Sequence, residues 1–273
     1  NKFELKKILI IGGDGYVGSE IDFGIKLSKE NLNILDKNSL VKNIKKYEPE
    51  IIINLAAVLF LNEKNKSLMK KINYESVYSL VYVCKKFNIK LIHYSSAAVF
   101  SGSINSTFHE YSSLKPLNYY GKTKKISEQI IKKNLKNYLI LRLGWVFGSL
   151  NKKNHRVFEK LINKLKLNET INLSYNQFIS PLYISDLNKI LKDLIANERK
   201  GTFNISNQGF CTAYEFFKYI KIKISSKSNL IKVDFNEFNK NRSPSEMIYS
   251  KKIYLKHWKK AINNYLENLV SIN

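Results

Sequence analysis

Several residue types are scarce in this sequence, and each shortage excludes a class of protein. Only two of its 273 residues are cysteines, Cys84 and Cys211, so neither a disulfide framework nor a cysteine-based zinc site is expected. The four histidines are scattered and no acidic cluster stands out, so we expect no bound metal. No apolar run reaches the ~20 residues that a membrane-spanning helix needs, and the N-terminal segment lacks signal-peptide features. We therefore expect a cytoplasmic protein without a membrane partner.

Arginine is also scarce, although the formal net charge is +24. Only four of the 46 basic residues are arginines, and arginine's bidentate fork is what reading base edges favours. The lysines are spread along the whole chain, so we interpret them as solvated surface and expect no nucleic-acid partner. A positive field of this size would still steer an anionic ligand such as a nucleotide.

Short apolar runs alternate with helical segments over the first 148 residues. The expected strands are 8–11, 25–27, 50–54, 90–95 and 138–142; the expected helices are 15–23, one that Asp36 caps and that runs to 47, 67–87 and 120–133. This alternation predicts an α/β fold with a doubly wound parallel sheet. Ligands bind at the carboxyl ends of such strands, which places the segments after strands 8–11, 50–54, 90–95 and 138–142 around one crevice.

The remainder, residues 149–273, is expected to form mainly a smaller α/β substrate-binding lobe. Its predicted helices are 157–167, 184–196 and 213–224, and its predicted strands are 201–205 and 229–233. Some of these segments could return to the first sheet.

A glycine-rich loop follows the first expected strand. Gly12, Gly15 and Gly18 are spaced as G-x-x-G-x-x-G, which permits close approach of a pyrophosphate to the backbone and predicts a dinucleotide site. A glycine-rich turn without a ligand is the alternative. After the second strand, where NAD sites usually carry an acid, the chain has Ser28 and Lys29. A hydroxyl and a cation suit a 2′-phosphate, so NADP is favoured and NAD remains an option.

Tyr120 and Lys124 are four residues apart on an expected helix and therefore lie on one face. The ammonium is expected to lower the pKa of the phenol, as suits a proton donor to a reducible carbonyl. Ser96, at the end of the fourth expected strand, is a candidate hydrogen-bond donor to that carbonyl. The alternative is that its hydroxyl only satisfies a strand-end backbone group.

Together these segments resemble the extended short-chain dehydrogenase/reductase superfamily, and within it they are most similar to the dTDP-4-dehydrorhamnose reductase family. The similar segments cover almost the whole chain: 8–18, 49–58, 91–102, 116–128, 141–148, 176–181, 201–217 and 242–245. The most specific is Leu-Arg-Leu-Gly-Trp-Val-Phe-Gly at 141–148, close to the family's Leu-Arg-Thr-Ser-Trp-Val-Tyr-Gly.

The resemblance implies a Rossmann-like NAD(P)-binding domain over 1–148 and a set of site residues. The catalytic residues would be Ser96, Tyr120 and Lys124. The cofactor would be bordered by Gly12, Gly15, Tyr16, Val17, Gly18, Ser28, Lys29, Asn33, Ile34, Ala56, Ala57, Val58, Tyr94, Tyr120 and Lys124. The substrate would be bordered by Ser96, Ala97, Trp145, Gln177 and Arg242. For Trp145, simple core packing is the alternative.

The implied function is NAD(P)H-dependent reduction of a keto group on a nucleotide-linked deoxy sugar, in the synthesis of surface polysaccharide precursors. The sequence departs from the family at Ala97 and Ala98, where the family has an acid and a phenol, and its first helix is shortened. Two alternatives therefore stay open: an NAD-dependent nucleotide-sugar epimerase or dehydratase, and a non-catalytic nucleotide-binding regulatory subunit. The partner would be a nucleotide sugar, and a homodimer could form.

Overall fold

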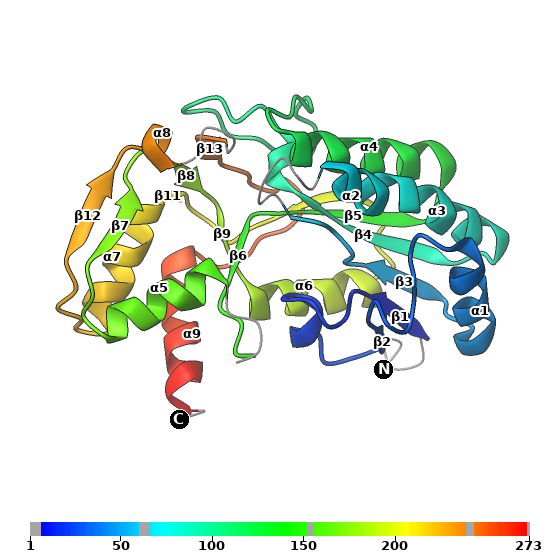
Figure 1. Ribbon diagram of the computed structural model, residues 1–273, viewed down its shortest axis with the longest axis horizontal. Coiled ribbons are helices and arrows are strands. Elements are labelled where there is room, and N and C mark those ends of the chain that lie inside the picture. The colour runs from blue at the N-terminus through cyan, green and yellow to red at the C-terminus, as the bar shows by residue number, and fades with distance from the viewer. Residues whose placement is uncertain (1–6, 60–65, 152–155, 239–242, 272–273) are drawn as a thin grey trace.

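Figure 1 shows a computed structural model of the chain, which describes residues 7–59, 66–151, 156–238 and 243–271. Its centre is a six-stranded sheet in the order β10-β5-β4-β3-β1-β2, in which every pair is parallel. The strands are β1 (Ile8–Ile11), β2 (Ile25–Leu27), β3 (Ile51–Asn54), β4 (Lys90–Ser96), β5 (Tyr138–Leu143) and β10 (Gly201–Ile205). The predicted Rossmann-like sheet is confirmed, and the carboxyl ends of β1, β3, β4 and β5 lie along one edge.

Helices cover both faces of this sheet because successive strand residues point to opposite sides. On one face, Leu9 and Ile11 pack with residues of α1 (Lys37–Tyr47), α3 (Ser76–Lys86) and α4 (Tyr119–Asn134). On the other, Ile8 and Ile10 pack with residues of α6 (Ile184–Ala196). The sheet is thus buried on both sides, as its continuous apolar strands predict.

Most of the other described helices and strands form a second group, beside the sheet in Figure 1. They are α5 (Val157–Lys166), α7 (Ala213–Lys223), α8 (Phe235–Phe238), α9 (Trp258–Ser271), the parallel pairs β6 (Trp145–Phe147) with β9 (Pro181–Tyr183) and β7 (Ile171–Ser174) with β12 (Leu230–Val233), and a small sheet of β11 (Cys211–Thr212), β8 (Phe178–Ile179) and β13 (Ser245–Glu246). Phe147, Phe158 and Phe216 form its aromatic core together with Tyr183 and Tyr265. Helix α9 has no counterpart among the predicted elements.

Two predicted helices differ from those observed. The helix expected over 15–23 is only a short 3₁₀ turn, η1 (Gly18–Glu20), because Ile21 is already extended and Gly24, at φ +74°, turns the chain into β2. The long helix expected over 67–87 is interrupted by a π-helical segment, η3 (Lys71–Glu75), between α2 (Lys66–Lys70) and α3. The predicted cap is confirmed: the side chain of Asp36 accepts a hydrogen bond from Asn38 N.

Hydrogen bonds join the short η1 turn and the residues before it to the second group of elements. The Glu20 carboxylate accepts hydrogen bonds from the backbone amides of Leu150 and Asn151, each at 2.9 Å. One turn earlier, the buried Tyr16 hydroxyl donates to Glu159 Oε1 of α5 at 2.5 Å. These contacts hold the glycine loop in place without a full first helix.

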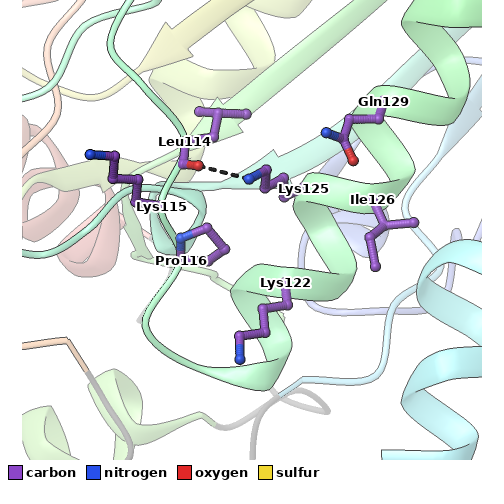
Figure 2. Close-up of a pocket in the computed structure, with 7 residues that line it drawn as sticks. All are labelled: Leu114, Lys115, Pro116, Lys122, Lys125, Ile126 and Gln129. Atoms are coloured by element: carbon purple, nitrogen blue, oxygen red, sulfur yellow. Dashed lines mark hydrogen bonds between the residues drawn. The ribbon is translucent and has the colours of Figure 1, made fainter.

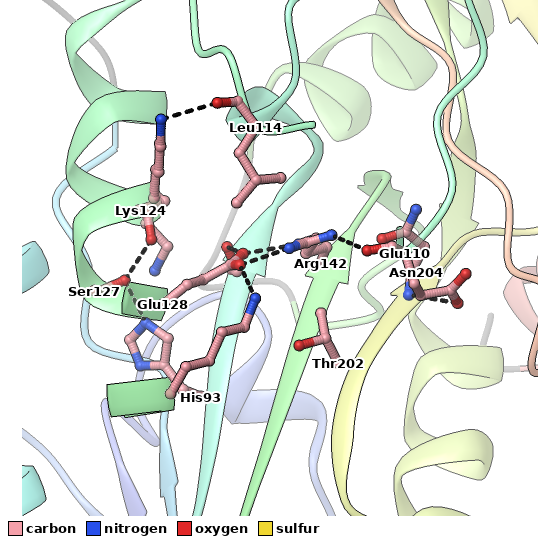
Figure 3. A network of polar contacts seen from close by, with 12 residues as sticks. His93, Glu110, Leu114, Lys124, Ser127, Glu128, Arg142, Thr202 and Asn204 are labelled. Carbon is pink, nitrogen blue, oxygen red and sulfur yellow. Dashed lines mark hydrogen bonds and ion pairs between the residues drawn. The ribbon is translucent and has the colours of Figure 1, made fainter. Parts of the chain in front are cut away.

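A buried ion pair joins α4 to β5 (Figure 3). The Arg142 guanidinium donates to both Glu128 carboxylate oxygens, Nε to Oε1 at 2.9 Å and Nη2 to Oε2 at 2.7 Å. Arg142 is 1% exposed and Glu128 0%. Burial alone would raise the pKa of Glu128, but hydrogen bonding to Arg142 and the charge of Arg142 outweigh it and lower the pKa below its usual value. Ser95 Oγ also donates to Glu128, at 2.7 Å.

We expect Glu128→Gln to lower the free energy of unfolding by about 3–5 kcal/mol, because it leaves Arg142 buried without its counter-ion. Urea unfolding at pH 7 measures this change. The matched control is Lys132→Gln, which removes the part-exposed ammonium 3.1 Å from the same carboxylate and should cost about 1 kcal/mol or less. Equal losses in the two variants would contradict the role given to the buried pair.

Candidate active site

The glycine loop forms a close-packed cradle at the end of β1. Gly12 has φ +79°, and a Cβ added there would lie 3.1 Å from Ala56 N of the segment after β3. A Cβ on Gly18 would lie 2.4 Å from Gly12 O, so neither position accepts a side chain without movement. At Gly15 the only described atom within 4 Å of an added Cβ is Gly12 O, at 3.3 Å, which leaves this side of the loop open. A dinucleotide pyrophosphate fits that arrangement.

The other predicted cofactor residues have varied surroundings. The Tyr16 side chain points away from the glycine loop: its hydroxyl donates to Glu159 of α5, and the guanidinium carbon of Arg156 lies 4.5 Å from its ring centre. Only the backbone of Tyr16 is therefore left to border a cofactor. Val17 is half-buried and packs against both the aromatic core of the second group of elements and the core between the sheet and α6. Within the described part of the chain, the buried Tyr94 hydroxyl has no hydrogen-bond partner. Such an orphaned polar atom is satisfied when a polar ligand reaches it.

After β2, the Ser28 hydroxyl donates to Glu30 Oε2 and lies 3.0 Å from Asn31 Oδ1. Glu30 was not identified from the sequence as a candidate cofactor residue, although this acid lies in the same turn as Ser28 and Lys29. Asn33 uses its side-chain oxygen to accept from Leu35 N, and Ile34 is buried in the core below α1. The side chain of Ile34 therefore contributes to packing.

Tyr120 and Lys124 lie in the first turns of α4, and the start of that helix is well defined. Asn118 caps it by accepting from Gly121 N at 2.8 Å. A Cβ on Gly121 would lie 2.1 Å from Ala98 O of η4 (Ala97–Val99), so this glycine lets α4 approach the end of β4 closely. There Ser96 lies close enough to Tyr120 for its hydroxyl to lower the pKa of the phenol. Ser96 Oγ accepts from Ala98 N at 3.2 Å, which confirms the structural interpretation of this residue; its role toward a substrate carbonyl stays a prediction.

The electrostatics of Tyr120 differ from the prediction. Burial raises the pKa of Tyr120 to about 12; hydrogen bonding to Ser96 and the charge of Arg156 lower it, while Glu246 raises it. The expected lowering by Lys124 is wrong for this structure, because Lys124 is not among the charges that act on the phenol. Burial instead lowers the pKa of Lys124 itself to about 8, against the opposing effect of Glu128.

The half-buried segment Ala56–Val58 is tied to α4 through side chains that sequence reasoning assigned no site role. Asn73 Oδ1 accepts from Val58 N at 2.8 Å, and Asn73 Nδ2 donates to Thr123 Oγ1 at 3.0 Å. Thr123 in turn donates to Tyr120 O at 2.7 Å. Asn73 lies in the π-helical segment, a distortion that is frequent at functional sites, but its partners are too far away in sequence to be inferred.

The predicted substrate residues are only partly brought together. Ala97 is buried beside Ser96. The half-buried Trp145 packs edge-on against Phe216, with ring centres 5.4 Å apart, so core packing accounts for part of its surface. Gln177 donates to Ser243 O at 3.2 Å, beside the β8–β13 pairing. Arg242 lies outside the described residues.

One described pocket lies away from these residues, on the outer side of α4 (Figure 2). It is lined by Leu114, Lys115, Pro116, Lys122, Lys125, Ile126 and Gln129. None of the predicted site residues lines it. Among the described residues, no group of three or more His, Cys, Asp or Glu side chains could hold a metal ion. None of the described helices is long and apolar enough to cross a membrane.

A parallel sheet with a glycine loop and a Ser-Tyr-Lys set at its strand ends defines a protein of the extended short-chain dehydrogenase/reductase type. More specifically, residues 6–271 match the family described as RmlD substrate binding domain, and the chain belongs to that family. This confirms the resemblance found in the sequence.

Known relatives are similar over most of the chain. The spore coat polysaccharide biosynthesis protein SpsK of Bacillus subtilis (strain 168) is 28% identical over 96% of this chain and 98% of its own. A dTDP-4-keto-6-deoxy-D-glucose reductase of Streptomyces niveus is 25% identical over 76% of this chain and 75% of its own. The crystal structure of dTDP-4-dehydrorhamnose reductase from Bacillus anthracis str. Ames in complex with NADP matches with a TM-score of 0.89 and 24% identity, covering 96% and 99% of the two chains.

One relative is of another kind. Methionine adenosyltransferase 2 subunit beta of Pongo abelii is 26% identical over 68% of this chain and 58% of its own. Sequence similarity at this level is therefore compatible with more than one function.

The buried ammonium of Lys124 should make stability depend on pH. Its pKa of about 8 lies below the ~10.4 of an exposed lysine, so between these values the unfolded state binds more protons and stability rises with pH. Lys124→Met removes this effect. The stability of Lys124→Met relative to wild type should therefore fall by about 2 kcal/mol from pH 7 to pH 9.5, measured by urea unfolding.

The control is Lys122→Met, an exposed lysine on the same helix. Its stability relative to wild type should change little over the same pH interval. If the two variants behave alike, Lys124 is not buried as a destabilising cation.

Proposed function

We propose that this protein catalyses the NADPH-dependent reduction of a keto group on a nucleotide-linked deoxy sugar, with NADH as an alternative cofactor. The observation that carries the proposal is the grouping of Ser96 and Tyr120, which lie close enough for Ser96 to lower the pKa of the phenol, with Lys124 one helical turn further on and the glycine cradle at the same sheet edge. The names of the Streptomyces niveus and Bacillus anthracis relatives support the chemistry. The name of the Bacillus subtilis relative supports a role in supplying polysaccharide precursors.

Each side chain has a defined part in this reaction. NADPH, when bound, supplies the hydride to the carbonyl carbon. The Tyr120 phenol, with a pKa of about 12, keeps its proton at neutral pH and donates it to the carbonyl oxygen. The Ser96 hydroxyl, which contacts that phenol, would turn to the same oxygen and orient it. Lys124, with a pKa of about 8, is mostly an ammonium at pH 7 and would hold the nicotinamide ribose hydroxyls.

The cofactor preference rests on the turn after β2. Ser28 and the exposed Lys29 suit a 2′-phosphate, and the Bacillus anthracis structure contains NADP. Glu30 beside Ser28 is a carboxylate that would accept a ribose 2′-hydroxyl, which keeps NADH in use.

The direct test is to follow NADPH oxidation by the purified protein against a panel of 4-keto sugar nucleotides. Turnover of one panel member supports the proposal. An epimerase or dehydratase would instead purify with NAD bound and act without added NADPH. Dinucleotide binding without turnover of any substrate would favour a regulatory subunit, an alternative that the Pongo abelii relative and the Ala97–Ala98 pair keep open.

Tyr120→Phe should lower kcat by about two to four orders of magnitude, as expected when a general acid is lost. NADPH affinity should change less than about threefold, because the phenyl ring is retained. The neighbouring Tyr119→Phe, which removes a hydroxyl from the same helical turn, is the control and should keep near-normal turnover. A Tyr120→Phe enzyme as fast as this control would refute the assigned role.

A further inference from the structure

His93 is a buried titratable residue that the proposed reaction does not use. It lies on β4 and is 1% exposed. Burial and, next, the nearby charge of Lys124 hold the pKa of His93 well below its usual range, so the imidazole is neutral. The charged group that acts on the Lys124 ammonium is the Glu128 carboxylate, and Arg142 in turn forms an ion pair with Glu128. A neutral buried imidazole needs a partner for each ring nitrogen.

Both ring nitrogens have such partners, and only one arrangement of protons satisfies them all. Ser127 Oγ donates to Lys124 O at 2.7 Å, so its single proton is used there. In the hydrogen bond of 3.0 Å between His93 Nε2 and Ser127 Oγ, the imidazole N–H must therefore be the donor. His93 Nδ1 is left as an acceptor, and Asn54 Nδ2 donates to it at 3.1 Å. Figure 3 shows Ser127 between His93 and Lys124.

The chain of hydrogen bonds continues to the proposed cofactor edge. Asn54 is the last residue of β3, and its Oδ1 accepts from Ala56 N at 3.1 Å. One continuous path therefore joins the Ala56 backbone to the Lys124 carbonyl through three buried side chains. It crosses from β3 to β4 and then to α4, and each of its ends belongs to a segment expected to border the dinucleotide.

We propose that Ser127 and His93 are positioning residues that set Lys124 relative to Ala56, and so shape the dinucleotide site. The inference rests on the proposed function, because it assigns Lys124 and Ala56 to that site. Thr123 and Glu128 hold the neighbouring positions of α4, and this path adds a direct link from the Lys124 turn to β4 and β3. Misplacement by about 1 Å at such a site costs up to ~10²-fold in rate.

The test compares two buried serines that donate to helical carbonyls. Ser127→Ala breaks the path; Ser76→Ala removes the Ser76 Oγ bond to Ile72 O, 2.8 Å long, which leads to no predicted site residue. Binding of NADPH itself is measured by fluorescence titration, together with the melting temperature of each variant. Ser127→Ala should weaken NADPH binding by about tenfold and Ser76→Ala by less than about twofold, while both melt at similarly lowered temperatures.

The outcomes separate the inference from the proposed function. If wild type binds neither NADPH nor NADH, the proposed function fails and the inference falls with it. If wild type binds NADPH and the two alanine variants bind it equally well, the inference alone is overturned. With the keto sugar found in the panel, Ser127→Ala should lower kcat about tenfold and leave the sugar KM within about twofold, a split that a general loss of stability would not produce.

A second pair of variants tests the hydrogen bonds without depending on Ser127. His93→Gln retains an N–H for Ser127 and an acceptor for Asn54, so NADPH binding should stay within about threefold of wild type. His93→Leu has similar bulk and neither group, and should behave like Ser127→Ala. Equal loss in the Gln and Leu variants would overturn the hydrogen-bonded path.

Discussion

The bidentate Glu128–Arg142 ion pair is the contact on which the arrangement of the site depends. Helix α4 must lie flat on the sheet and still bring its first two turns to the strand ends. Glu128 follows Lys124 by one turn, and its carboxylate is bound from β5 by Arg142 and from β4 by Ser95. A charge buried this deeply is tolerated only when nearly all its hydrogen-bonding capacity is used, so the pair holds the Glu128 turn of α4 against β4 and β5.

The same pair explains the charge state of Lys124. Because Glu128 is already neutralised by Arg142 and Lys132, it only partly stabilises the Lys124 ammonium, and burial lowers the pKa of Lys124 to about 8. His93 stays neutral, which avoids a further buried cation beside Lys124 and Arg142. The site is thus left short of negative charge, as suits a protein whose proposed cofactor and substrate both carry phosphates, and the +24 net charge adds to this at long range.

Features encoded within a few residues were predictable from the sequence. The Gly12–Gly18 loop after an apolar strand, the Asp36 cap and the Tyr120–Lys124 spacing need only local information. The short η1 turn was not predictable in full, because Glu20 and Tyr16 are held by residues 129–143 positions away. The high pKa of Tyr120 depends on how deeply α4 packs, and Asn73, His93 and Arg142 acquire their roles only when distant strands meet. Their positions in the sequence are ordinary polar positions on strands or helices.

The two alanines after Ser96 bear on the expected contacts with a sugar and not on the arrangement of Ser96 and Tyr120. Ala97 and Ala98 are both buried, and Ala98 O is where Gly121 brings α4 against η4. The hydrogen bond from Ala98 N to Ser96 Oγ comes from the backbone, so it does not depend on which side chain follows Ser96. The Ser96–Tyr120 contact therefore survives the loss of the acid and the phenol that the family carries there. In the proposed reaction an acid and a phenol at these positions would offer polar contact with the sugar, so we expect the two alanines to alter which sugar fits and to leave the proposed proton donor, Tyr120, in place.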